Sequence, residues 1–139
     1  HTLHIMITFD DFKKVEITVG KILSVEKVPD TDKLLKLSVD FGLKAQPIAG
    51  FVQDKTGVEE RQPVLESVRD VRQIISGIAL YFPDIQVLVG KKCMFVTNLE
   101  PRVIRGLASN GMLFAVSTED GKFSILEPNA DIPEGTRAK

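Results

Sequence analysis

"VEITVGKILSVEKVPDTDKLLKLSVDFG", residues 15–42, contains two runs in which apolar and polar side chains alternate. From 15 to 25 the odd positions are mostly apolar and the even ones mostly polar or small, and from 35 to 41 the odd positions are all apolar. A two-residue period is typical of a strand that buries one face. The stretch therefore predicts two successive strands, with a bend or bulge in the first at Gly20.

The segment between these runs, "VPDTDK" at 28–33, is expected to be a turn. Pro29 restricts its own backbone, and the carboxylates of Asp30 and Asp32 can accept hydrogen bonds from nearby amides. These carboxylates also resemble the start of a calcium-binding loop, but the strand predicted to follow leaves no room for the remaining ligands. Turn capping is therefore the preferred interpretation of both aspartates.

Further strands are predicted downstream. The strand-like stretches are "RQIISGIA", "KKCMFVTN", "GMLFAVS" and "FSILEP", and "FPDIQVLVG" fits a short helix that begins after Pro83 and ends before Gly90. "TEDGK" is a hairpin signal with Gly121 at its turn. About five strands with a short helix before the fourth predict an all-β, five-stranded, partly open barrel of the oligonucleotide/oligosaccharide-binding (OB) fold, followed by a C-terminal extension.

Residues 7–139 are expected to form one domain. "TFDDF" at 8–12 predicts a capped single helical turn. Residues 1–6 are interpreted as an N-terminal extension, either natural upstream sequence or residues added for expression. Residues 43–71 fit the barrel pattern poorly, and their extended pieces around a turn signal at Thr56 predict a projecting hairpin.

Composition excludes several functions. The chain has 139 residues and a formal net charge of −1, so overall charge does not support nucleic-acid binding, although clustered Lys and Arg bind phosphate in neutral proteins too.

Cys93 is the only cysteine, which excludes an internal disulfide and fits a reducing compartment. No apolar run is long enough to cross a bilayer, so a cytoplasmic protein is expected. His1 and His4 have no further ligands nearby, and no metal site is expected.

Catalytic motifs are also absent from the sequence. It contains no Gly-rich phosphate loop and no nucleophile elbow, and no histidine follows His4 to serve as a base. We therefore expect a binding function without a cofactor, and an enzyme is the least favoured alternative.

"NLEPRVIRGLASNGMLFA", residues 98–115, is the strongest candidate for a binding site. Pro101 stiffens the approach to Arg102 and Arg105, and Gly106 leaves guanidinium groups and backbone amides accessible to phosphate. The alternative interpretation is a surface loop that happens to carry charge.

Weaker candidates are predicted near the mouth of the barrel. Lys33 and Lys36 follow the first turn, in a loop that commonly approaches a ligand in this fold, although a solvated polar face explains either residue. Met112 could pack in the core or lie under a base, and core packing is preferred. Gly77, after Ser76, marks either a bulge or a close approach of a ligand.

These motifs resemble, in the same order, those of the transfer-RNA-binding domain family. The matching stretches are "DFKKVEITVGKILSVEKVPDTDKLLKLSVDFG", "RQIISGIA", "VGKK", "NLEPRVIRGLASNGMLFA" and "PEGTRAK", which leave out mainly 43–71. The family includes the C-terminal domain of many bacterial methionyl-tRNA synthetases and free-standing tRNA-binding proteins. The resemblance implies an OB fold that holds tRNA by its shape and backbone and adds tRNA affinity to a synthetase whose catalytic body lies elsewhere.

The resemblance also implies contact residues and partners. The matching positions are Lys33, Lys36, Ser76, Asn98, Arg102, Arg105, Ser109 and Met112. The charged members would neutralise phosphates, and Ser and Asn would bond to sugar or phosphate oxygens. Family members are typically homodimers, and the tail 127–139 is the region implied in that contact. A methionyl-tRNA synthetase catalytic body is the second implied protein partner.

Two departures from the family pattern affect these expectations. Thr18 stands where the family often has Arg in an "RVG" motif, which removes one cation. Residues 43–71 replace a short hairpin turn, and the alternatives are that they shield the RNA face, enlarge it or add a dimer contact. The rival function is a protein-binding chaperone, because secretion-chaperone relatives share the fold and the "DF..V" motif, although they lack the "PRVIRG" and "SNGM" combination.

Overall fold

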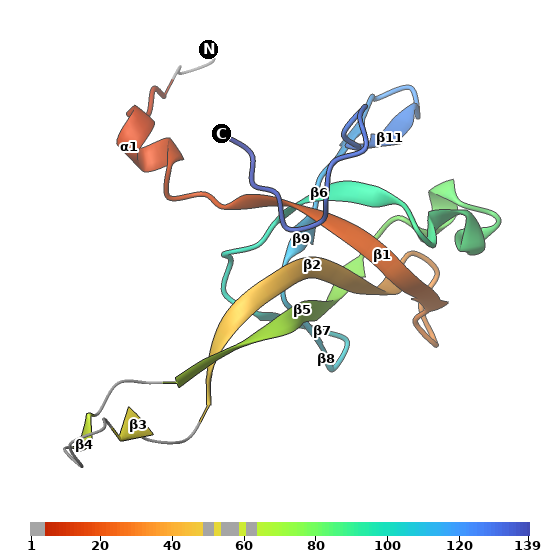
Figure 1. The fold of residues 1–139 in the computed structure, drawn as a ribbon. Helices are drawn as coiled ribbons and strands as arrows, with labels where there is room; N and C mark the ends of the chain where they lie inside the picture. Colours follow the sequence, from red (N-terminus) through yellow and green to blue (C-terminus); the bar gives the residue numbers. More distant parts are fainter. Residues whose placement is uncertain (1–4, 49–51, 54–58, 61–63) are drawn as a thin grey trace.

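The structure, a computed structural model, describes residues 5–48, 52–53, 59–60 and 64–139 (Figure 1). Its elements in chain order are α1 (Phe9–Phe12), β1 (Ile17–Lys27), β2 (Leu35–Ile48), β3 (Val52–Gln53), β4 (Glu59–Glu60), β5 (Val64–Ser76), the 3₁₀ turns η1 (Ala79–Tyr81) and η2 (Ile85–Leu88), β6 (Lys92–Val96), β7 (Arg102–Ile104), β8 (Leu107–Ser109), β9 (Met112–Leu113), β10 (Ala115–Ser117) and β11 (Phe123–Ile125). The all-β class is confirmed. The predictions for His1, His4 and the turn at Thr56 fall outside the described residues.

A curled five-stranded sheet in the order β5–β2–β1–β6–β9 forms an open half-barrel in the described part of the chain. Its pairs are all antiparallel. β1 changes partner along its length, because Ile17–Lys21 pair with β6 whereas the pairing with β2 begins at Lys21. This change of partner curls the sheet into the predicted OB-like barrel, and η2 is the short helix predicted before the fourth strand.

The C-terminal tail adds a further strand-like edge to β1. The Val19 N–H donates to the Thr136 carbonyl at 2.9 Å, and the Gly135 N–H donates back to the Val19 carbonyl at 2.8 Å. The Ala138 N–H donates to the Ile17 carbonyl at 2.9 Å. The predicted C-terminal extension is therefore part of the barrel wall in this chain.

The alternation predicted for the first strand holds only in part. Val19 and Val25 are buried as expected, but Ile22 is fully buried and Leu23 is 42% exposed. The register with β2 shifts directly after Ile22, and such a bulge moves the following side chains to the opposite face. The prediction that odd positions face the core is therefore wrong at Leu23, and the bulge lies beyond Gly20.

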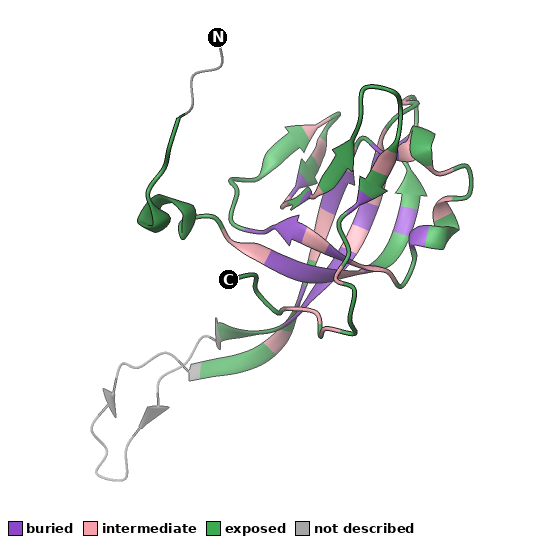
Figure 2. Cartoon of the chain, turned by 90° about the horizontal axis from the view of Figure 1, so that it is seen from above, coloured by how far each residue is buried: buried purple, intermediate pink, exposed green. Residues whose placement is uncertain are grey.

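Gly20 instead permits close packing at the centre of the barrel. A Cβ atom at this position would lie 2.6 Å from the side chains of both Val39 and Phe41, and 2.9 Å from that of Phe95. The rings of Phe41 and Phe95 meet edge to face, with their centroids 5.2 Å apart. Figure 2 shows the buried residues gathered on the strands around β1, whereas α1, capped by Thr8 as predicted, has no buried residue.

The described residues 43–48 and 64–71 lengthen β2 and β5. After a register shift following Asp40, Leu43 pairs with Arg69, and pairing continues to Ile48 and Val64. These paired residues form the base of a projecting hairpin, as the sequence predicted, and Figure 1 shows it directed away from the barrel. Downstream, β10 and β11 form the hairpin predicted around Gly121.

Candidate nucleic-acid interface

The stretch 98–115 contains a hairpin that the sequence pattern did not predict. β7 and β8 pair antiparallel, and the two residues that join them, Arg105 and Gly106, have φ angles of +52° and +78°. Two successive residues with positive φ are characteristic of a type I′ turn, for which Asn-Gly is the usual pair. The hairpin was not predicted because arginine, in place of the usual asparagine, is the first residue of its turn. Arg105 therefore lies at the tip, and Arg102 lies at the base opposite Ser109.

Hydrogen bonds attach this hairpin to β5. Ser109 is 4% exposed, and its Oγ accepts a hydrogen bond from the Ile75 N–H at 3.0 Å. The Asn110 N–H donates to the Gln73 carbonyl, and the Gln73 side-chain amide donates to the Ala108 carbonyl, both at 2.9 Å. The hairpin is thus held against the outer edge of the five-stranded sheet.

Strand pairing and one side-chain hydrogen bond bring the backbones of four of the eight predicted contact residues into one row. Lys36 of β2 pairs with Ile75 of β5, Ile75 is bonded to Ser109 of β8, and Ser109 pairs with Arg102 of β7. Ser76 follows Ile75 at the end of β5 and pairs with Leu35, so in a regular strand its side chain points to the opposite face from that of Ile75. We call Lys36, Ser76, Ser109 and Arg102 the cationic row.

Exposed cations lie on the row and on the loops beside it. Arg102, Arg105 and Lys33 are exposed, and none of them forms an ion pair with a residue that the structure describes. Lys36 pairs with Glu26 at 3.0 Å, but the two side chains are 37% and 63% exposed. An exposed pair of this kind contributes little energy, so a phosphate can compete for Lys36. Four cations therefore lie in this part of the surface, together with the exposed carboxylates of Asp30, Asp32 and Glu100.

Met112 is 44% exposed, so the core-packing interpretation is wrong. Met112 lies on the edge strand β9 and pairs with Val96 of β6, and Leu113 takes the core position next to it. A two-residue strand is too short for periodicity to indicate which residue faces inward. The thioether is accessible two residues after Asn110, at the foot of the hairpin.

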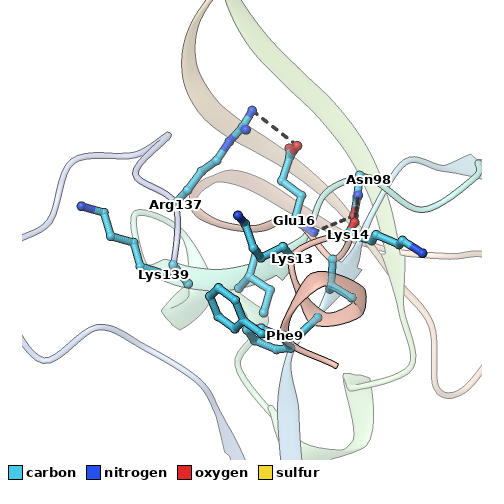
Figure 3. Close-up of a pocket in the computed structure, with 11 residues that line it drawn as sticks. Phe9, Lys13, Lys14, Glu16, Asn98, Arg137 and Lys139 are labelled. Atoms are coloured by element: carbon cyan, nitrogen blue, oxygen red, sulfur yellow. Dashed lines mark hydrogen bonds and ion pairs between the residues drawn. The ribbon is translucent and has the colours of Figure 1, made fainter. Parts of the chain in front are cut away.

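Asn98 lies on a different surface, in a groove between α1 and the C-terminal tail (Figure 3). Its Oδ1 accepts a hydrogen bond from the Glu16 N–H at 2.8 Å, and its Nδ2 donates to the Lys14 carbonyl at 2.5 Å. These bonds fix the chain just before β1. The groove has a volume of about 360 Å³, and Phe9 and Arg137 line it from opposite ends of the sequence. We call it the terminal groove.

Thr18, the departure from the family pattern, is buried beneath the same tail. Its Oγ1 lies 2.7 Å from the Oγ1 of Thr97, which also bonds to the Glu16 carboxylate at 2.7 Å. Arg137 in turn pairs with Glu16 at 3.4 Å. The position therefore belongs to an internal polar network, separate from the cationic row.

The turn between β1 and β2 is held differently from the prediction. The Thr31 hydroxyl donates to the Val28 carbonyl at 2.8 Å, and Asp30 adopts a left-handed conformation with φ +62°. Neither aspartate carboxylate forms a hydrogen bond within the described residues, so carboxylate capping is wrong here. The described residues also contain no group of three or more acidic, His or Cys side chains that could hold a metal.

The hairpin base at 43–48 and 64–71 leaves the barrel at the far end of β2 from the row. Leu43 lies seven residues beyond Lys36, roughly 23 Å along an extended strand. The described part of the segment therefore does not cover the cationic row. Across the described residues, no helix has the length and apolar character that a membrane span requires.

The domain is a curled β-barrel that carries cations on the β1–β2 loop, on β2 and on the β7–β8 hairpin before β9. These features define an OB-like nucleic-acid-binding domain. Residues 64–137 match the family model described as "Putative tRNA binding domain". The chain belongs to this tRNA-binding domain family. The family match is to a binding domain, and the chain is a non-catalytic domain.

Similar proteins support this assignment. The structure of a MetRS-related protein from Pyrococcus horikoshii is 32% identical, covers 98% of this chain and 100% of that one, and has a TM-score of 0.72. The methionine–tRNA ligase of Methanocorpusculum labreanum is 40% identical over 95% of this chain, which spans only 15% of that ligase. The chaperone CsaA of Bacillus anthracis covers 97% of this chain and 100% of its own with a TM-score of 0.68, but at 21% identity the likeness concerns the fold alone.

Proposed function

We propose that this chain is an accessory module that recognises tRNA by shape and backbone and raises the tRNA affinity of an aminoacyl-tRNA synthetase, of the methionyl type. The cationic row carries the proposal, because it connects Lys36 to Arg102, and exposed Arg105 and Lys33 lie on the adjoining turns. Phosphate contacts of this kind position an RNA without reading its sequence.

The predicted contact residues have different roles in this proposal. Arg102, Arg105, Lys33 and Lys36 neutralise phosphates, and Ser76 bonds to sugar or phosphate oxygens. Ser109 is buried, so its role is to hold the hairpin that carries the arginines, and Asn98 orders the segment before β1. Met112 is accessible for contact with a sugar or base.

A surface with few cations binds RNA weakly on its own, and weak binding fits an accessory role. When a module is linked to a synthetase that already contacts the same tRNA, its binding becomes intramolecular, and a modest affinity adds strongly to the total. The similar methionine–tRNA ligases, of which this chain spans about a sixth, support this arrangement.

The test is the double variant Arg102→Ala/Arg105→Ala. Each lost phosphate contact reduces the slope of log affinity against log salt by about 1, so we expect weaker tRNA binding and a slope smaller by about 2. The double variant Lys44→Ala/Lys122→Ala removes two exposed lysines that lie outside both the row and the terminal groove, and it is the control. Unchanged binding by the arginine variant, or preference of the wild type for an unfolded polypeptide over tRNA, would refute the proposal.

We further propose that a second copy of the chain covers the terminal groove. Phe9 is 71% exposed and Phe12 45% exposed, and Ile5, Met6 and Ile7 before them are exposed as well. A contiguous apolar surface of this kind is typical of an interaction site. A symmetric pair would present two cationic rows to one tRNA. Sedimentation should show a dimer that Phe9→Ser weakens, and a wild-type monomer at high concentration would exclude it.

A further inference from the structure

Two aromatic rings stack on the surface at the end of η1. Tyr81 and Phe123 lie with ring centroids 4.0 Å apart and planes 7° from parallel. Phe82 meets Phe123 edge on at 5.9 Å, and both phenylalanines pack against the hydrophobic core. Tyr81 nevertheless remains 46% exposed. A fixed, exposed ring that is already stacked on one side can continue the stack with another planar group.

The same turn is joined to the loop beside the cationic row. The Ala79 N–H donates to the Lys33 carbonyl at 3.0 Å, so η1 begins against the β1–β2 loop. Tyr81 lies two residues further on, with its Cα at most about 7.6 Å from that of Ala79. Ser76, at the end of the row, precedes Ala79 by three residues. An RNA strand that contacts Lys33 and Ser76 therefore passes close to the exposed ring.

The charges around the rings favour a neutral ligand over a phosphate. A cavity of about 420 Å³ lies beside the pair, lined by Tyr81, Phe123, Lys91 and Glu127 among others. Lys91 and Glu127 pair at 3.2 Å and largely neutralise each other. The cavity thus offers an aromatic face together with donors and acceptors at its rim. This combination suits a planar heterocycle with polar edges.

We propose that Tyr81, supported by Phe123, is a stacking platform for one unpaired base of the RNA held by the cationic row. The proposal rests on the function proposed above and deepens it by adding a base contact to a set of backbone contacts. Stacking accepts any base because every base has a π-face, so the platform detects an unpaired nucleotide without selecting a sequence.

The sequence provides a direct probe of this platform. Tyr81 is the only tyrosine and the chain has no tryptophan, so intrinsic emission reports this ring alone. We expect saturating tRNA to quench the emission, after correction for RNA absorption, and to shield Tyr81 from acrylamide. A blunt-ended RNA duplex, in which every base is paired, should leave the emission nearly unchanged. Equal quenching by the paired RNA, or by an unfolded polypeptide alone, would overturn the proposal.

Substitution at the ring gives an independent measurement. Tyr81→Ala should weaken tRNA binding by roughly 5- to 160-fold, the range for loss of one stacked base, without changing the salt slope. Tyr81→Phe keeps the ring and should bind nearly as the wild type does. Wild-type affinity in Tyr81→Ala, or unchanged emission with tRNA demonstrably bound, would overturn the platform alone. Failure of the wild type to bind tRNA at all would overturn the proposed function as well.

Discussion

The hydroxyl of Ser109 accepts a hydrogen bond from the backbone N–H of Ile75 across 3.0 Å, and this bond links the arginine-bearing hairpin to the central sheet. Ile75 is 6% exposed and Ser109 is 4% exposed, so water has little access to replace the bond. Ser109 also pairs with Arg102. The bond to Ile75 therefore fixes the backbone position from which the side chain of Arg102 extends. A buried polar contact thus supports an exposed charged surface.

Ser109→Ala should destabilise the domain and weaken tRNA binding together. The variant leaves the buried Ile75 N–H without its partner, which costs about 1–3 kcal/mol of unfolding free energy. Binding should weaken with no change in salt slope, because no cation is lost. Urea unfolding and filter binding measure the two effects, with Ser117→Ala, at an exposed serine, as the control. An unchanged unfolding free energy would contradict the role assigned to the hydroxyl.

Gly20→Ala should destabilise the barrel. The added Cβ would lie 2.6 Å from Val39 and Phe41 side-chain atoms, and overpacking of a dense core costs typically about 1–3 kcal/mol. Gly77→Ala is the matched control, because a Cβ there has nothing within 4 Å. Chemical denaturation should separate the two variants clearly. Equal stability would mean that the strands around Gly20 can separate at little cost.

Periodicity was sufficient for the barrel but failed where the backbone departs from a regular strand. The alternation at 35–41 predicted β2 correctly, since Leu35, Leu37 and Val39 are all fully buried. It failed at Leu23, because a bulge changes which side chains face inward and single-sequence patterns do not show where a bulge lies.

The candidate site was predicted through its charges more than through its geometry. Arg102 and Arg105 were identified as a pair, but their hairpin was not, since Arg-Gly is an unusual sequence for a type I′ turn. Tyr81 and Phe123 were missed altogether, because 42 positions separate them in the sequence and only the folded chain brings their rings together. A long-range contact of this kind leaves no local signal.

Asp70 should make the stability of the domain fall at acid pH. Burial alone would raise the pKa of this carboxyl, but hydrogen bonds and charge from Arg72, with the charge of Lys44, lower the pKa below its usual 3.8. A lowered pKa stabilises the folded state above the pKa of the unfolded chain, and this stabilisation is lost as pH falls through the folded value. Unfolding free energies between about pH 6 and 3 should therefore decline less steeply in Asp70→Asn than in the wild type.

The matched control for that titration is Asp131→Asn, whose side chain is 95% exposed. It should follow the wild-type pH dependence closely, because an exposed ion pair contributes little to stability. Arg72 donates from Nε and Nη2 to the two carboxylate oxygens of Asp70, at 3.1 and 2.9 Å. If the unfolding free energies of Asp70→Asn and Asp131→Asn declined in the same way below about pH 5, this bidentate contact would not contribute to acid sensitivity.

Cys93 should be unreactive in the folded protein. Burial, and then the nearby charge of Glu127, raises the pKa of its thiol to about 12, and its residue is fully buried on β6. Because the thiolate is the reactive form, a disulfide reagent at pH 8 should label the native chain only as fast as β6 opens. In urea it should label one thiol per chain at once. Since Cys93 pairs with Gly20, the slow native rate should rise in Gly20→Ala and stay at the wild-type value in Gly77→Ala. Rapid labelling of the native wild type would show that the centre of the barrel is open to solvent.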